Sequence, residues 1–321
     1  MILHKNIYKS KWDSTLTEYT IKDLNEDTLK DFISQTELAG RRPVNKGNNS
    51  TLLSKLKLTQ ENVLSYAAWH LFSDSQPVEL QTAVFRGTNK TSFSDIKHFR
   101  GNIFILFKTA VAYINEKINW RVEFGNDMKR HEIPEIPVTA IREALVNSFV
   151  HRDYNNPKSN EIAIFDDRIE IYNPGSFPTG LKPDDFFKGE ECSYLRNPKI
   201  AEMFYYTKDI DRWGSGLQRI KKECEKNGVP YKIKLLNNGF LVIFYRNKSE
   251  DGVQKTTQKT TQKILDLIRR KPEISRKEIT EALGSITDAG VKYHLAKMKK
   301  KGIIKRIGPA KGGYWKVVEN E

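Results

Sequence analysis

The chain has 321 residues, of which 38% are hydrophobic and 29% charged, which is typical of a globular protein with material for more than one domain. No apolar run approaches the roughly 18 residues of a membrane-spanning helix, and the N-terminus has no apolar stretch of signal-peptide length. Two cysteines, Cys192 and Cys224, are too few for a disulfide framework or a cysteine-based zinc site. These features predict a cytoplasmic protein.

The net charge of +14 is unevenly distributed along the chain. Residues 251–321 contain 17 Lys or Arg against 8 Asp or Glu, a net charge of +9, whereas the other 250 residues carry +5. This asymmetry predicts that the C-terminal part binds a polyanion, most simply double-stranded DNA. The alternative interpretation is a solvated basic surface without such a ligand.

Composition and periodicity divide the chain into four parts. We expect an N-terminal extension over residues 1–19, an α+β body over 20–247, a polar linker over 248–262 and a small domain over 263–321. Within the body, residues 20–125 are predicted to be a helical lead-in with the first strands, and 126–247 the part that carries the motifs. The predicted helices are 24–34, two within 50–73, 101–118 and 211–227, besides the one at 141–154 described next; the predicted strands are 80–86, 119–125, 160–165, 168–172, 232–236 and 240–245. The body should therefore be an α/β sandwich with helices mainly on one face of a largely antiparallel sheet.

The segment IREALVNSFVHRDY, residues 141–154, is the part of the body with the clearest potential for chemistry. Its apolar residues recur every four positions, which predicts a helix with one buried face. On a neighbouring face, Glu143 and Asn147 lie one turn apart, where a carboxylate and a carboxamide can together hold a water and a metal ion. In the purely structural interpretation, Asn147 caps or cross-links a turn and Glu143 pairs with Arg142 or Arg152.

The triplet His151-Arg152-Asp153 that follows this helix copies the catalytic loop of protein kinases. A kinase needs Asn five residues after the Asp to hold a metal, and Lys158 stands there, so we reject the kinase interpretation. Either Arg152 and Asp153 fix the turn after the helix, or His151 and Arg152 lie near an anionic ligand. The chain also lacks the GxxxxGK[ST] motif of a P-loop, so motor chemistry of the helicase type is not supported.

Three motifs occur in the order of the Bergerat-type (GHKL) ATP-binding fold: the polar helix, the NPG turn at 173–175 and the GSG segment at 214–216. Glycines at a helix start let backbone N–H groups approach a phosphate. The segments 141–154, 167–178, 196–204 and 212–220 closely resemble the family called RecG-like C-terminal, or Schlafen-related transcriptional regulators, of bacteria and archaea. This resemblance covers roughly residues 20–247 and implies a GHKL-like ATP-binding body.

Carried onto this chain, the resemblance implies ATP and Mg²⁺ as cofactors. It implies that Glu143, as the catalytic residue, positions the attacking water and that Asn147 holds Mg²⁺ against the phosphates. The implied nucleotide contacts come from Asn147, from Asn173 and Gly175 on the adenine side, and from Gly214, Ser215 and Gly216 on the phosphate side.

The chain departs from the family's pattern in three respects. Asn173 stands where GHKL ATPases place an Asp that reads the adenine amino group, and a carboxamide accepts that hydrogen bond less strongly. Phe177 replaces a second glycine, and the phosphate-side loop is short. Family members usually begin with an AlbA-like domain that this sequence does not show, so we expect a shortened member or a fragment. The first two departures favour nucleotide binding over turnover, with at most a weak ATPase activity.

The C-terminal domain has the pattern of a winged helix, three helices followed by a hairpin. Ser275 and Glu278 form a capping box for the second helix, and Thr287 can cap the third. The third helix should enter the major groove and the wing should contact phosphates. The predicted DNA-binding residues are Thr287, Lys292, Tyr293 and Lys297 on the third helix with its cap, and Arg306 and Lys311 on the wing. The alternative is a winged helix that serves protein contact or dimerisation.

These features predict a DNA-binding transcriptional regulator whose body senses a nucleotide or a partner, and a homodimer is compatible with them. An alternative, from a different functional class, is an ATP-dependent enzyme or switch in nucleic-acid metabolism. A third is a degenerate body that serves only as a dimerisation scaffold.

Overall fold

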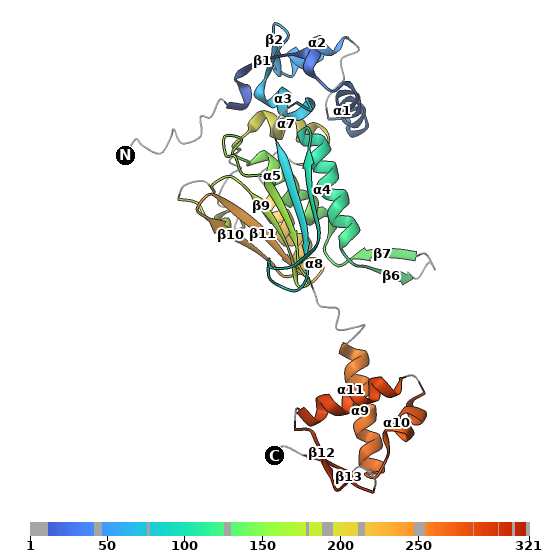
Figure 1. Ribbon diagram of the computed structural model, residues 1–321. Coiled ribbons are helices and arrows are strands. Elements are labelled where there is room, and N and C mark those ends of the chain that lie inside the picture. The colour runs from blue at the N-terminus through green and yellow to red at the C-terminus, as the bar shows by residue number, and fades with distance from the viewer. Residues whose placement is uncertain are drawn as a thin grey trace. The chain divides into compact units, whose positions relative to one another are not determined.

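A computed structural model of the chain divides it into two compact units, Met1–Asn247 and Lys248–Glu321 (Figure 1). The structure describes residues 12–41, 47–75, 78–124, 130–177, 180–187, 195–210, 216–246, 254–284, 286–300, 302–309 and 312–318. Within these ranges, no helix is both long and apolar enough to cross a membrane.

The first unit is built on a six-stranded sheet with the strand order β10-β11-β9-β8-β4-β5. Neighbouring strands are antiparallel except for β4 and β8, which run parallel, and this confirms the predicted largely antiparallel sheet. The strands are β4 (Glu79–Phe85), β5 (Phe93–Arg100), β8 (Asn160–Ile164), β9 (Arg168–Asn173), β10 (Tyr231–Leu236) and β11 (Gly239–Tyr245). Strand β5 has no counterpart among the predicted strands, because it is an edge strand with mostly exposed residues and lacks regular apolar alternation.

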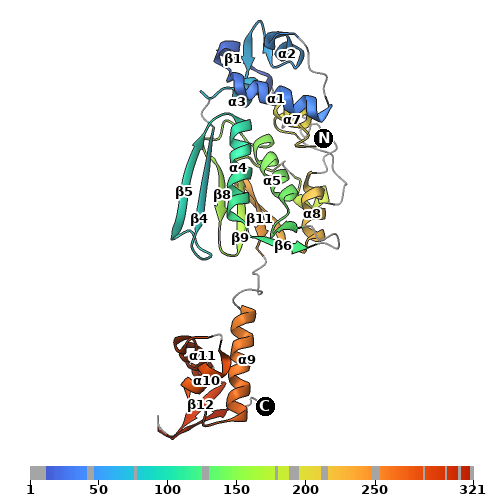
Figure 2. The same cartoon turned by 90° about the vertical axis from the view of Figure 1, so that its right-hand side faces the viewer.

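Helices α4 (Ile103–Lys117), α5 (Val138–Val150) and α8 (Gly216–Lys226) lie over one face of this sheet (Figure 2). The residues Ile141, Leu145 and Phe149 of α5 are at most 1% exposed, so the predicted apolar face is the buried face. The shorter helices α6 (Pro183–Phe187) and α7 (Pro198–Tyr206) complete this part of the unit. The prediction of helices on one face is confirmed.

The N-terminal part of the unit is helical with a small three-stranded sheet, ordered β1-β3-β2. Its elements are η1 (Trp12–Ser14), β1 (Leu16–Thr20), η2 (Ile21–Asp23), α1 (Glu26–Ala39), α2 (Asn49–Lys55), β2 (Thr59–Gln60), β3 (Val63–Ser65) and α3 (Tyr66–Phe72). The predicted extension over 1–19 is wrong for residues 12–19. Trp12 stacks on Tyr66 and Tyr154, and β1 pairs with β3, so long-range contacts make these residues part of the body. Residues 1–11 lie outside the described part.

Strand β6 (Trp120–Phe124) was predicted, but it does not join the central sheet. It forms a separate antiparallel hairpin with β7 (Arg130–Pro134). In Figure 1 this hairpin extends away from the helices and the sheet.

The second unit has the order helix, helix, helix, hairpin of a winged helix. Its elements are α9 (Gln254–Arg270), α10 (Arg276–Leu283), α11 (Asp288–Lys300), β12 (Ile304–Ile307) and β13 (Tyr314–Val317). Ser275 and Glu278 form the predicted capping box, and Thr287 Oγ1 accepts from the Gly290 N–H at the start of α11. The predicted linker over 248–262 is too long. Helix α9 already begins at Gln254, because the Gln-Lys-Thr repeat is rich in residues that tolerate a helix and runs directly into an apolar helical segment.

Candidate nucleotide and DNA sites

Helices α5 and α8 pack against each other through a buried polar contact centred on Glu143. This side chain is 4% exposed, and its Oε2 accepts a hydrogen bond of 3.2 Å from Arg219 Nη1 on α8. Its Oε1 lies 3.4 Å from Asn147 Nδ2, one turn later on α5. The structural interpretation expected Glu143 to pair with Arg142 or Arg152, whereas its arginine partner in the structure is Arg219. The cation comes from a helix 76 residues away in sequence.

Gly216, the first residue of α8, completes this contact. A Cβ at this position would overlap Glu143 Oε1 and would lie 3.2 Å from Asn147 Nδ2. Only a residue without a side chain lets the start of α8 approach the carboxylate so closely. The structure thus brings three of the predicted site residues together: Glu143, Asn147 and Gly216. The other two residues of the GSG segment, Gly214 and Ser215, lie outside the described residues.

Asn173, the last residue of β9, is fully buried. Among the described residues, neither its Oδ1 nor its Nδ2 has a hydrogen-bond partner. Strand alternation places it on the same face as Ile169 and Ile171, which belong to the core beneath the helices. A buried carboxamide without partners costs roughly 1–3 kcal/mol, so a position like this one needs a reason beyond folding.

The NPG turn after β9 is joined to the turn after α5. The Asp153 N–H donates to the Pro174 carbonyl at 2.8 Å. A Cβ on Gly175 would lie 2.5 Å from the His151 carbonyl oxygen and 3.0 Å from the Asp153 nitrogen, so these two backbones require glycine here. The predicted role of Gly175 in an adenine-side turn is therefore accompanied by a packing role that the sequence did not reveal.

The HRD triplet has a structural role in the case of Arg152. Its side chain is 5% exposed, and its guanidinium donates to Asn160 Oδ1 at 3.0 Å and to the Lys158 carbonyl at 2.7 Å. Asn197 Nδ2, at the start of α7, donates to the carbonyls of Val150 and Arg152 at the end of α5. Of the two alternatives, the structure favours Arg152 as the residue that fixes the turn.

The His151 side chain is half-buried, whereas that of Arg152 is buried. Burial, with a further contribution from the positive charge of Arg196, lowers the pKa of His151 to about 4. The imidazole is therefore neutral at pH 7 in the chain without a ligand.

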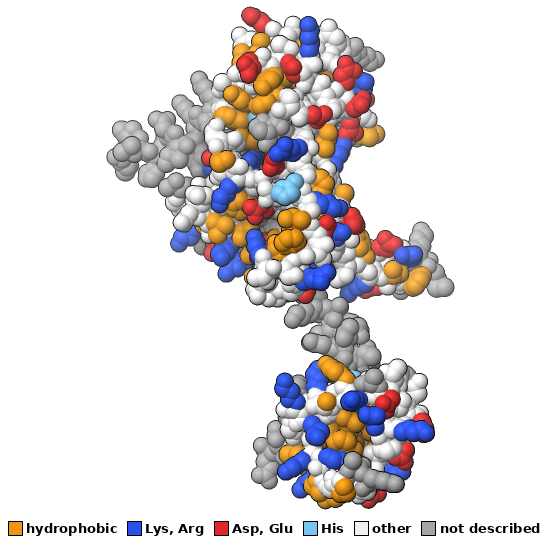
Figure 3. Space-filling view, viewed as in Figure 1, with side chains coloured by type: hydrophobic (Ala, Val, Ile, Leu, Met, Phe, Trp, Pro, Cys, Tyr) orange, Lys and Arg blue, Asp and Glu red, His pale blue; other side chains and the backbone are white. Residues whose placement is uncertain are grey.

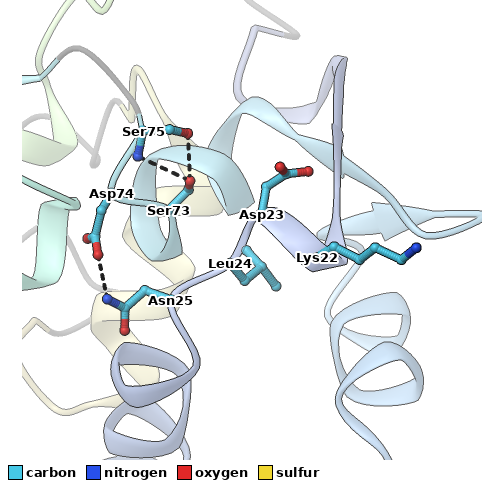
Figure 4. Close-up of a pocket in the computed structure, with 7 residues that line it drawn as sticks. All are labelled: Lys22, Asp23, Leu24, Asn25, Ser73, Asp74 and Ser75. Carbon is cyan, nitrogen blue, oxygen red and sulfur yellow. Dashed lines mark hydrogen bonds between the residues drawn. The ribbon is translucent and has the colours of Figure 1, made fainter.

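A pocket in the N-terminal part of the body, lined by residues 22–25 and 73–75, lies in another part of the unit from these residues (Figure 4). Its polar groups hold one another. Asn25 Nδ2 donates to Asp74, which also accepts from Asn102 Nδ2, and the hydroxyls of Ser73 and Ser75 lie 2.9 Å apart. These contacts account for Asn25, Ser73, Asp74 and Ser75 as structural links.

In the second unit, the outer face of α11 is exposed and basic. Lys292, Tyr293 and Lys297 are exposed, and Lys297 Nζ lies over the Tyr293 ring at 5.6 Å from its centroid. Thr287 is exposed at the cap. Figure 3 shows basic side chains spread over this unit. Asp288, at the start of the helix, forms an ion pair with Arg276 at 2.6 Å. This pairing offsets its negative charge, which would otherwise repel a polyanion.

The wing presents cations other than those predicted. Arg306 is half-buried, and its guanidinium lies 4.9 Å from the centroid of the Trp315 ring. Lys305 and Lys316 pair across the strands and are exposed on the opposite face. The period-2 alternation of a strand would have identified these two lysines, because Ile304 and Arg306 share the inner face. Lys311, at the tip, lies outside the described residues.

Comparisons with known proteins agree with this division. Residues 158–244 match the family described as "Putative ATP-dependent DNA helicase recG C-terminal", and residues 257–305 match the family described as "Winged helix-turn-helix DNA-binding". The chain has a RecG-C-terminal-like ATPase domain and a winged helix. No curated protein matches the chain.

A solved structure with a similar fold is that of the DIP2311 protein from Corynebacterium diphtheriae, with a TM-score of 0.63 and 18% sequence identity. The match covers 96% of this chain and 64% of that one, so the chain spans about two-thirds of the length of the protein it matches. At this level of identity the likeness concerns the fold.

Arg219 is the residue at the body site that sequence reasoning missed. It lies three residues after Gly216, and no pattern in the sequence links it to Glu143 on α5. Arg219 belongs to the RWGSGLQRI segment. That motif indicated where the phosphate side of the site lies, but it did not identify Arg219 as the partner of Glu143.

Proposed function

We propose that this protein is a DNA-binding transcriptional regulator whose RecG-C-terminal-like body binds ATP with Mg²⁺ and whose winged helix binds duplex DNA. The observation that carries the nucleotide part is Asn173, a fully buried carboxamide with both polar atoms unpartnered among the described residues. A carboxamide presents one acceptor and one donor side by side, which matches the hydrogen-bonding edge of adenine in a bidentate manner.

The remaining residues of a GHKL-type site are compatible with this ligand. Asn147 would supply an oxygen to Mg²⁺, which neutralises phosphate charge, and Gly216 places the N-terminus of α8 beside Asn147 without a side chain in between. Asn147 Nδ2 faces Glu143 Oε1, so its Oδ1 is the atom available to a metal ion. The nucleotide would lie along the start of α8, with adenine at Asn173.

Glu143 decides between sensing and turnover. Its carboxylate is buried, accepts from Arg219 and lies against Gly216. Arg219 and Asn147 already occupy both oxygens of the Glu143 carboxylate, which leaves it poorly placed to position an attacking water. We therefore propose that the body binds and releases nucleotide, and that any hydrolysis is slow.

The DNA part of the proposal relies on the match to winged helix-turn-helix domains and on the exposed cations of α11 and the wing. Lysines at these positions neutralise phosphates, which releases counterions and supplies sequence-independent affinity. Tyr293, exposed between them, is suited to contact a base edge or a sugar. Since DNA is the ligand, we propose a cytoplasmic location.

The nucleotide site is tested by calorimetry of the full chain with ATP and Mg²⁺. Asn147→Ala should weaken Mg²⁺-dependent binding by roughly tenfold or more, because a metal ligand is lost. Thr139→Ala, on the same helix but engaged with Glu223, is the matched control and should bind as the wild type does. Absence of ATP binding to the wild type would remove the nucleotide from the proposal.

The DNA site is tested by fluorescence anisotropy with a duplex at several salt concentrations. Lys292→Ala/Lys297→Ala should reduce the magnitude of the slope of log K against log salt by about 2, one unit for each phosphate contact. Lys277→Ala, exposed on α10, is the control that should leave the slope unchanged. An unchanged slope in the double variant would contradict the role of α11.

A second candidate function is an ATP-dependent enzyme or switch in nucleic-acid metabolism. It is favoured by the position of Glu143 one turn before Asn147, the arrangement in which a carboxylate positions water next to a metal. Steady ATP hydrolysis by the wild type, lost in Glu143→Gln with ATP binding retained, would establish this function in place of a sensor.

A further inference from the structure

The β6–β7 hairpin is a projecting arm with an apolar strand. Trp120, Val122 and Phe124 alternate along β6 and are 42%, 45% and 73% exposed. Figure 1 shows the arm extending beyond the helices and the sheet of the first unit. An isolated two-stranded hairpin is at best marginally stable in water, and exposed aromatic residues on it add to the cost.

The arm is nevertheless firmly attached at its base. Glu135, next to the end of β7, accepts 2.8 Å from Arg246 Nη2 and 2.9 Å from the Asn119 N–H. Arg246 Nη1 in turn donates to the Phe165 carbonyl at 3.0 Å, beside the central sheet. Since both charged side chains of this pair are largely buried, the arm is held in one place relative to the sheet.

The first residue pairs of the arm show which of its cross-strand pairs are hydrogen-bonded and which are not. Asn119 and Glu135 form a bonded pair, in which the Glu135 N–H donates to the Asn119 carbonyl at 2.9 Å. Trp120 is opposite Pro134, which has no N–H. In an antiparallel ladder bonded and non-bonded pairs alternate, so the pair of Trp120 and Pro134 is non-bonded.

This alternation of bonded and non-bonded pairs determines which backbone groups of β6 face its open edge. Arg121 and Glu123 direct their N–H and C=O groups toward β7, whereas Trp120, Val122 and Phe124 direct theirs away from it. Within the described residues, β6 pairs with β7 alone. An open edge of this kind is a template for another strand.

The sequence of β6 is complementary to itself in the antiparallel direction. About Val122 as centre, the order is aromatic, basic, Val, acidic, aromatic. A second β6 laid antiparallel with its Val122 opposite Val122 places Arg121 opposite Glu123 and Trp120 opposite Phe124. The residues that face the edge then form the bonded pairs. Arg121 and Glu123 form the non-bonded pair, in which side chains lie closest.

We propose that β6 pairs antiparallel with β6 of a second copy of this chain, about a two-fold axis at Val122. The pairing produces a continuous four-stranded sheet, β7-β6-β6-β7, with both sets of Trp120, Val122 and Phe124 on one face. A two-fold interface of this type requires a self-complementary surface, and the charge order of β6 meets that requirement. The dimer brings two winged helices into one assembly, and the pairing does not depend on a nucleotide.

The test is sedimentation velocity of the full chain, with charge reversals on β6. Arg121→Glu makes both charged side chains of the strand acidic, and Glu123→Arg makes both basic. Each variant alone should dimerise at least about tenfold more weakly, since two symmetry-related contacts become repulsive. An equimolar mixture of the two should form a mixed dimer with the wild-type affinity, because every acidic side chain then faces a basic one.

This mixing separates the proposed contact from a contact within one chain. The Arg121–Glu123 ion pair within β6, at 3.2 Å, stays broken in both variants, so recovery in the mixture can come only from pairing between chains. Arg130→Glu is the matched control. It breaks the Arg130–Glu132 ion pair of 2.8 Å on β7 and should leave the dimer intact.

A second variant addresses the backbone. Val122→Pro removes an N–H that faces the open edge and not β7, so circular dichroism should be unchanged while the dimer is lost. A wild-type chain that stays monomeric at on the order of 100 μM would overturn the proposal. So would single variants that dimerise normally, or a mixture that fails to form the mixed dimer. Loss of ATP or DNA binding, by contrast, would contradict the proposed function and not the pairing of β6 strands.

Discussion

The two candidate sites of this protein use polar residues in opposite ways. In the body, Glu143, Asn173 and Arg152 are at most 5% exposed, and the cation that pairs with Glu143 and the acceptors of Arg152 come from other elements or from loops. In the winged helix, Lys292, Tyr293 and Lys297 are exposed on one helix. The body site therefore depends on how elements pack, whereas the helix surface depends on local periodicity and charge.

This difference predicts whether a mutation should change stability, ligand binding or both. A change in the body site should alter stability and ligand binding together, because the same contacts hold the helices. A change on α11 should alter DNA binding with little effect on stability, since exposed lysines contribute little to folding.

The largest effect is expected from Gly216→Val. The new side chain would overlap the Glu143 carboxylate, and the start of α8 would have to move away from α5. The body should lose about 3 kcal/mol of stability, while the winged helix keeps its own transition and its affinity for DNA. Thermal unfolding of the full chain, followed by calorimetry, measures both transitions.

A double-mutant cycle with Glu143→Ala sharpens this prediction. Removal of the carboxylate makes room for the new side chain, so the loss in the double variant should be smaller than the sum of the two single losses. Additive losses would mean that the strain at Gly216 lies elsewhere.

The body should also respond to acid. His70 is 3% exposed, and burial lowers its pKa to about 4, below its usual 6.5. The folded chain holds the neutral ring, so its contribution to stability is fully present above pH 6.5 and is lost as the pH falls toward 4. Between pH 7 and 5 the body should lose about 2 kcal/mol from this group.

Urea unfolding at the two pH values measures this loss. His70→Gln should reduce the pH dependence by that amount, whereas His98→Gln, at an exposed position on β5, should leave it as it is. An unchanged pH dependence in His70→Gln would contradict the assignment of the acid response to this buried ring.

The smallest effect, and the one most specific to the nucleotide proposal, concerns Asn173. Asn173→Leu should leave stability unchanged or raise it by about 1 kcal/mol, because an unpartnered buried carboxamide is replaced by an apolar group of similar size. The same variant should lose ATP binding.

Asn160→Leu is the matched control for that variant. Asn160 is also buried in a strand of the same sheet, but its Oδ1 accepts from Arg152 and its Nδ2 donates to the Ser148 carbonyl at 2.9 Å. This substitution should cost about 2 kcal/mol or more, measured by urea unfolding. Equal losses in the two variants would show that Asn173 has hydrogen bonds of its own.

Much of the fold followed from local patterns. The apolar repeat of 141–154 predicted α5 and its buried face, and the strands predicted at 232–236 and 240–245 are β10 and β11. In the winged helix, the Ser275–Glu278 box and the Thr287 cap were read directly from the sequence. Edge strand β5 was missed, and residues 12–19 were separated from the body, because stacking of Trp12 on distant rings leaves no local signal.

The sequence by itself predicted most of the elements, the caps of α10 and α11, and three residues that the structure brings together, Glu143, Asn147 and Gly216. These depend on periods and turns of a few residues. Only the tertiary structure decided that Arg219 neutralises Glu143, that Arg152 serves the turn, that Arg306 packs on Trp315 while Lys305 and Lys316 face outward, and that Asn173 is buried without a partner. Apart from the register of the wing and the turn contacts of Arg152, those outcomes depend on how elements far apart in the chain pack together, which no local pattern encodes.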